Sequence, residues 1–165
     1  MTVQDPLPAN TYRVATPGVR VRAAAMLAVP GVLAFTVPPI GFVASFLLPV
    51  LSARVRSGFW PRTSPVVGHL CAALALAGLW LPALLAMVSS GRLSFEATAW
   101  LVVPLCAPSR TALIIPAGLA ALTYLSGLTC SLISRSPWPW VIGAWGAPIA
   151  HWVASSWLVD FSCVA

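Results

Sequence analysis

Four apolar stretches without an acidic or basic residue make up most of this chain, at residues 23–53, 66–88, 112–134 and 138–159. A helix needs about 20 apolar residues to cross a lipid bilayer, and each stretch reaches that length. Only 7% of the 165 residues are charged, whereas about a quarter is usual in soluble domains. We therefore predict an all-α fold, a small polytopic transmembrane helical bundle with about four membrane segments.

The first stretch, residues 23–53, is long for one crossing and is interrupted by prolines. Pro38 and Pro39 remove two backbone donors and push Val37 out of helical dihedrals, so the helix is predicted to break there. Each half would reach only about 22 Å of a bilayer core that is about 30 Å thick. This length favours a single crossing with a broken middle. The alternative is a re-entrant hairpin that returns to the side it left.

The basic residues, all arginine, bear on this choice because cytoplasmic loops carry an excess of basic residues. With four simple crossings and the amino terminus inside, five arginines lie inside (Arg13, Arg20, Arg22, Arg92, Arg110) and four outside (Arg54, Arg56, Arg62, Arg135). A re-entrant first stretch moves Arg54, Arg56, Arg62 and Arg135 inside and Arg92 and Arg110 outside, giving seven against two. Charge favours the hairpin and length favours the broken crossing. We expect the broken crossing.

The remaining segments complete the predicted topology. Residues 1–22 are polar and contain prolines, so we expect a tail ahead of a single transmembrane domain at residues 23–165. The apolar piece at about 95–108 is too short to span and is predicted to be interfacial or re-entrant. The expected location is a cell membrane, as a multi-pass protein of a bacterial inner membrane.

The last apolar stretch is predicted to be a helix with two different faces. At 100° per residue, Gly143, Ala147, Ala150 and Ala154 fall within about 40° of one direction. Trp138, Trp145 and Trp152 cluster on the opposite side. Small residues let helices approach closely in lipid, and tryptophan suits the lipid side or its headgroup boundary. We expect the small residues to form the helix contact.

His151 is the most notable polar residue, because an ionisable group in mid-membrane usually faces protein or a water-filled cavity. It is a candidate proton carrier or ligand contact. His69 lies too far along the membrane normal, by about 15 Å, to share a haem iron with it. Asp160 projects about 180° away on the same helix. A partner of His151 must therefore come from another helix or another molecule.

The cysteines are predicted to be packing residues, with no CxxC spacing. Cys71 and Cys130 lie at similar depth in neighbouring antiparallel segments. Each shares a face with small residues, so we expect these two faces to pack together. Cys106 and Cys163 would share the opposite side, where a disulfide is the alternative to free thiols.

The chain contains no P-loop, GxSxG or metal-ligand pattern, and no basic stripe typical of nucleic-acid binding. We therefore expect no catalytic, cofactor or metal residues, and the lipid bilayer, another copy or a larger membrane complex as partners. The leading hypothesis is a non-enzymatic accessory or structural membrane protein that acts through helix packing. A second is a small-molecule transport or immunity-type protein using His151. A third is an intramembrane enzyme acting on a lipid-like substrate through His151, Glu96 or Arg110.

Overall fold

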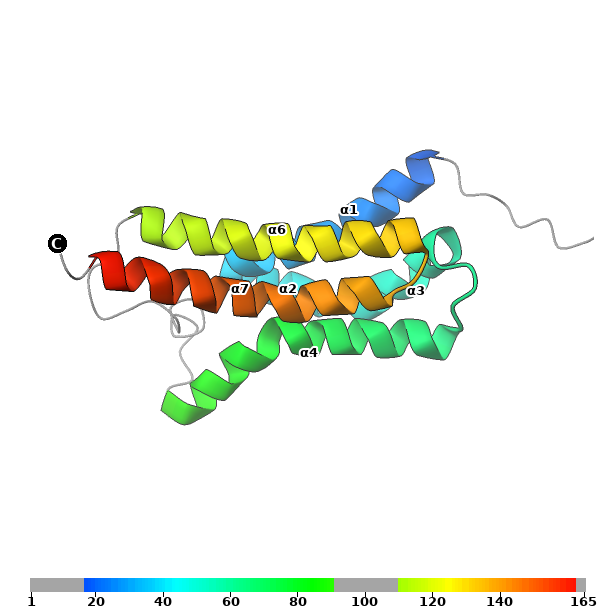
Figure 1. Cartoon of the computed structure of the whole chain (residues 1–165). Helices are drawn as coiled ribbons and strands as arrows, with labels where there is room; N and C mark the ends of the chain where they lie inside the picture. Colours follow the sequence, from blue (N-terminus) through cyan, green and yellow to red (C-terminus); the bar gives the residue numbers. More distant parts are fainter. Residues whose placement is uncertain (1–16, 91–109, 163–165) are drawn as a thin grey trace, which may run out of the picture.

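The computed structural model describes residues 17–90 and 110–162, and the described residues form six helices (Figure 1). The prediction of an all-helical fold is confirmed, since no strand occurs in these two ranges. The helices are α1 (Pro17–Thr36), α2 (Pro38–Ser45), α3 (Leu48–Phe59), α4 (Pro65–Ser90), α6 (Arg110–Ser134) and α7 (Trp138–Ser162).

The chain breaks where the two prolines were expected to break it. Val37 has φ −135° and ψ 74°, outside the helical region, and α2 then begins on Pro38 and Pro39. Proline suits the first helical positions because its missing N–H has no partner there in any case. At the other end, α1 begins with Pro17, so residues 17–22 of the predicted tail are helical.

After this break the chain turns back on itself instead of continuing in one direction. Gly41 of α2 lies directly against the α1 backbone at Leu33 and Ala34. Helix α3 also packs against α1, and its end lies near the start of α1 (Figure 1). The chain therefore doubles back after the break, as in the hairpin alternative, and its path through a membrane stays a prediction. The length estimate failed because α1 has 20 residues, about 30 Å at 1.5 Å per residue, once its arginine-bearing first turns are counted.

The other three helices correspond to the remaining predicted segments, with ends shifted by up to three residues. Helices α6 and α7 lie antiparallel and make the most extensive contact in the molecule. Helix α4 packs on α7 and α3, and α1 packs on α6. The hairpin thus covers one side of the α4–α7–α6 layer. The predicted piece at 95–108 lies outside the described residues.

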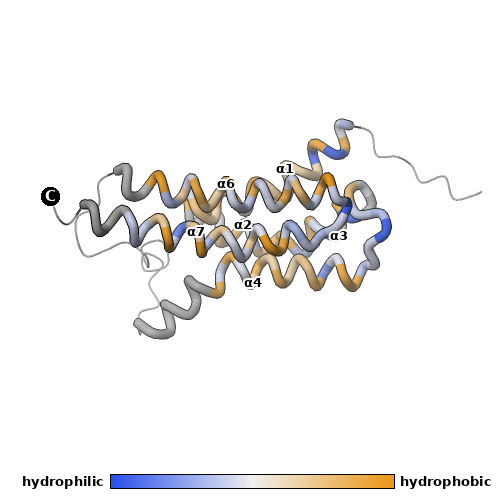
Figure 2. Tube along the Cα trace, viewed as in Figure 1, coloured by the Kyte–Doolittle hydropathy of each residue, from blue (hydrophilic) through white to orange (hydrophobic). Residues whose placement is uncertain are grey.

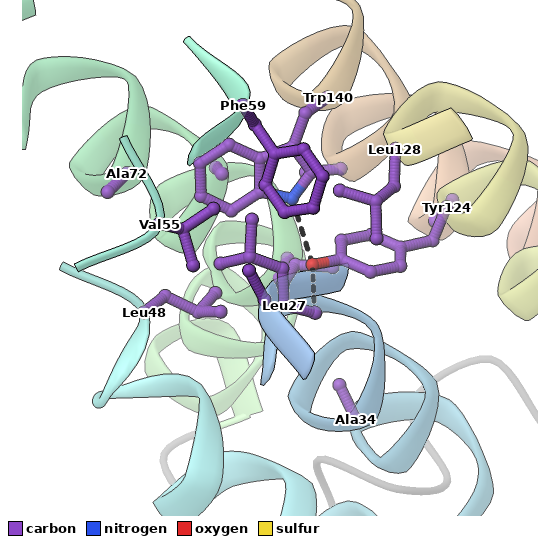
Figure 3. Packing of buried hydrophobic residues seen from close by; sticks show 14 of the residues in the cluster. Leu27, Ala34, Leu48, Val55, Phe59, Ala72, Tyr124, Leu128 and Trp140 are labelled. Atoms are coloured by element: carbon purple, nitrogen blue, oxygen red, sulfur yellow. Dashed lines mark hydrogen bonds between the residues drawn. The ribbon is translucent and has the colours of Figure 1, made fainter. Parts of the chain in front are cut away.

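Buried side chains fill the space between the hairpin and the three long helices. The largest are Trp60, Trp140, Tyr124, Leu27 and Leu48. Figure 3 shows the last four of them in the core. Two of the described helical segments, Pro17–Thr36 and Ile114–Ser134, are long and apolar enough to cross a membrane. In each, only 28% of the apolar window is buried inside the protein. The prediction of four membrane crossings stays a prediction.

Candidate functional site

The centre of the molecule is a hydrogen-bonded tyrosine that joins three helices. The Tyr124 hydroxyl of α6 donates to the Leu27 carbonyl oxygen of α1 at 2.8 Å, and it accepts from Trp140 Nε1 of α7 at 2.9 Å (Figure 3). Tyr124 is fully buried, and its ring lies directly over Gly31. A side chain at position 31 would occupy the place of the ring. Tyr124 therefore fixes α1, α6 and α7 relative to one another.

Three further tryptophans also donate their indole N–H to a different element. Trp60, just after α3, donates to Ser131 Oγ of α6 at 3.0 Å. Trp80 of α4 donates to Ser45 Oγ of α2. Trp145 of α7 donates to the Leu74 carbonyl oxygen of α4 at 3.0 Å. We call these three contacts, together with that of Trp140, the four indole ties.

Two of the indole ties engage buried serines of the interior, Ser45 and Ser131. Ser131 Oγ, which accepts from Trp60, itself donates to the Ser136 carbonyl oxygen at 2.6 Å. The Trp60 and Trp140 rings also stack, with centroids 5.6 Å apart. Among the described residues, no buried side-chain nitrogen or oxygen lacks a partner. An orphaned buried donor costs about 1–3 kcal/mol. The buried ties of Trp60, Trp80 and Trp140 therefore each favour one arrangement of the two elements that they join.

The helical wheel placed Trp145 with Trp138 and Trp152 on the lipid side of the last helix. Trp138 and Trp152 are 50% and 60% exposed. Trp145 is 38% exposed, and it packs on Gly78 of α4. A Cβ at Gly78 would lie 2.5 Å from Trp145 Cδ1, so the glycine provides the space for the indole. Such a pairing between distant segments leaves no signal in the spacing of either helix.

The small residues of α7 lie against α6 at the start of the predicted face. A Cβ added at Gly127 of α6 would lie 2.6 Å from the Gly143 Cα of α7, so the two backbones touch. Ala147 is fully buried, whereas Ala150 and Ala154 are half-buried. The closest approach of the two helices is therefore at the glycine pair.

The two cysteine faces do not meet as expected. Cys71 is buried in α4, whereas Cys130 is exposed on α6. Helix α4 packs on α7 and α3 instead of on α6. The reason is the contact between Gly127 and Gly143, which uses the small-residue side of α6 for α7. Cys106 and Cys163 lie outside the described residues.

Of the candidate polar residues, His151 is the one whose side chain the structure describes. It is half-buried, and its ring stacks on Phe35 of α1 with centroids 6.3 Å apart. Phe35 lies two residues before the break at Val37, so the neighbour of His151 comes from the hairpin. Arg110 begins α6, but its side chain, like Glu96 as a whole, lies outside the described part. His69 is exposed, with Nδ1 2.8 Å from the Pro65 carbonyl oxygen.

No protein-family model, curated protein or solved structure matches this chain. Function is therefore inferred from the residues and their contacts alone. Within the described ranges, no group of three or more His, Cys, Asp or Glu side chains could hold a metal ion. The described side chains form an interior joined by hydrogen bonds, with one histidine at its edge and a largely apolar exterior.

Replacing Tyr124 by phenylalanine is expected to lower the free energy of unfolding by about 1–3 kcal/mol, because the Trp140 N–H then loses its acceptor. The measurement is unfolding in mixed micelles with an increasing fraction of sodium dodecyl sulfate. Thr129→Val on the same helix is the control, since Thr129 is exposed and donates only to the Leu125 carbonyl of its own helix. Equal losses in both variants would contradict the bridging role of Tyr124.

Proposed function

We propose that this protein is an integral membrane protein whose described helices are embedded in a lipid bilayer. The support is the apolar exterior: Ile133, Val66, Ile142 and Trp157 are each at least 70% exposed, on three different helices. In water, exposure of large apolar side chains on this scale would promote aggregation. The low buried fraction of both candidate spans points the same way, because core helices of soluble proteins are mostly buried.

In this proposal the hairpin enters the membrane and returns, while α4, α6 and α7 each cross it. The start of α1 and the end of α7 then lie on opposite sides, consistent with their positions at opposite ends of the bundle (Figure 1). The end that carries the start of α1, the loop after α3 and the α6–α7 turn holds most of the arginines, so it faces the cytoplasm. The expected location remains a bacterial inner membrane.

For its activity we propose a non-enzymatic accessory or structural role, carried out by helix packing against another copy or a larger membrane complex. The observation that carries this proposal is the set of indole ties. Three of these ties and the Tyr124 bridge pair buried polar groups of different elements with one another, which favours a rigid scaffold over a solute path. The outer helix faces are then the surfaces available for a partner.

His151 supports a second candidate, a transport or immunity-type protein. It lies near the middle of the 25-residue α7 and next to the break between α1 and α2. Broken helices and ionisable groups at mid-membrane depth are recurrent features of transport sites. The third hypothesis, an intramembrane enzyme, depends on Glu96 and Arg110, whose side chains lie outside the described part.

The His151→Phe variant separates the first two candidates. Because phenylalanine keeps a ring against Phe35, the scaffold role predicts unchanged assembly and unchanged complementation of a deletion strain. Transport by way of His151 predicts lost complementation at normal protein level.

The assembly itself is measured by cross-linking in native membranes, followed by purification in mild detergent and determination of the complex mass. A complex of defined stoichiometry, equal in the parent and in His151→Phe, is the expected result. His69→Phe serves as control, because His69 is exposed and its hydrogen-bond partner, Pro65, belongs to the same helix. A lone monomer in the parent membranes would contradict the scaffold role.

A further inference from the structure

Six of the seven arginines in the described ranges gather at one end of the molecule, although they come from four separate places in the chain. Figure 2 shows this end as the hydrophilic one, against a largely apolar bundle. The start of α1, the end of α3, the loop before α4 and the turn between α6 and α7 all lie there (Figure 1). Together they carry Arg20, Arg22, Arg54, Arg56, Arg62 and Arg135.

The part of the chain that the structure describes places no acidic residue at this arginine end. The three acidic residues are Asp5, Glu96 and Asp160, so the sequence from 17 to 90 contains none. Asp160 belongs to α7 near its far end. Five of the six arginines are exposed, and Arg56 lies half-buried along Gly68 of α4. None of the six makes an ion pair or side-chain hydrogen bond with another residue of the described part.

Arg135 adds a second observation. Its φ is 54°, in the left-handed region where helix ends usually carry glycine or asparagine. For a residue with a Cβ, this conformation costs about 1–2 kcal/mol of free energy. The turn between α6 and α7 thus keeps a guanidinium at a position where the backbone alone would favour glycine.

We propose that the arginine end binds the phosphate groups of anionic phospholipids. The guanidinium fork suits bidentate contact with phosphate, and arginine is the only basic residue type that the chain uses. Trp138, half exposed at the start of α7, lies at this end, where tryptophan anchors proteins at the membrane–water boundary. The inference rests on the proposed membrane location and adds to it a class of lipid.

The test is the lipid preference of the full chain in vesicles of phosphatidylcholine mixed with phosphatidylglycerol. Lipids with brominated acyl chains quench tryptophan fluorescence on contact, so quenching by each brominated lipid at equal mole fraction gives the preference. We expect stronger quenching by phosphatidylglycerol, decreasing as salt is added. Each arginine near an anionic surface contributes up to about fivefold in affinity. The triple variant Arg20→Gln/Arg54→Gln/Arg62→Gln should therefore lose most of the preference.

These three arginines are exposed, so their replacement leaves the interior unchanged. Arg110→Gln is the control, because α6 begins with Arg110 at the opposite end. Equal quenching by both lipids in the parent, or a preference that the triple variant retains, would overturn the proposal. The proposal would also be overturned if the triple variant kept its lipid preference but lost a bound acidic protein of fixed stoichiometry. Extraction of the parent chain by alkaline carbonate would instead refute the membrane location itself.

Discussion

Replacing Gly127 by leucine is expected to separate α6 from α7 and to lower the free energy of unfolding by about 3 kcal/mol or more. A Cβ at this position would lie 2.6 Å from the Gly143 Cα and 2.7 Å from the Pro139 carbonyl oxygen. Both atoms belong to the backbone of α7, so no side chain can rotate away. The helices must move apart, and this movement also stretches the bond between Tyr124 and Trp140. Unfolding in mixed micelles measures the loss.

Gly118 provides a matched control on the same helix. A Cβ at Gly118 meets no atom within 4 Å, so Gly118→Leu has the same change in helix propensity without the clash. We expect its free energy of unfolding to change by less than about 1 kcal/mol. If the two variants were equally stable, the close contact of α6 and α7 would be refuted.

The second large effect concerns the hairpin formed by α1, α2 and α3. Cysteines introduced at Gly18 and at Thr63, each in a chain whose native cysteines are replaced by alanine, are expected to react with a membrane-impermeant maleimide from the same side. Gly18 lies in the first turn of α1, and Thr63 follows α3. A single broken crossing would put them on opposite sides. Labelling of intact cells and of inverted membrane vesicles distinguishes the two results.

Gly41→Leu should disrupt this hairpin. The new side chain would collide with the α1 backbone at Leu33 and Ala34, and we expect a loss of about 3 kcal/mol or more in the free energy of unfolding. Gly18→Leu is the control, since Gly18 has open space around its Cα. Normal stability of Gly41→Leu would show that α2 does not lie against α1.

The sequence predicted the helices well because their signal is local. Apolar length and the Pro38–Pro39 pair sufficed to identify the segments and the break between α1 and α2. Length favoured a chain that continues in one direction after the break, because only the uncharged part of α1 was included. Its first turns carry Arg20 and Arg22 and are nevertheless helical.

The contacts between helices could be predicted only in part. A helical wheel gives the direction of a side chain, which is why the small face of α7 at Gly143 was predicted. It cannot say which neighbour receives that side chain. The indole of Trp145 reaches α4 because Gly78 leaves room for it, and Gly78 lies far away in the sequence. Likewise, α6 packs on α7 through the glycine pair, and not on α4 through the face that carries Cys130.

The Tyr124 bridge has a consequence for the order of assembly. Its acceptor, Leu27, precedes it by 97 residues, and Trp60 precedes Ser131 by 71. During synthesis the hairpin therefore emerges long before Tyr124 and Ser131, which hydrogen-bond to it or to the residue that follows it. Until α6 and α7 arrive, the hairpin is joined to the rest of the protein only by its contacts with α4. Completion of the interior thus waits until α6 and α7 have left the ribosome.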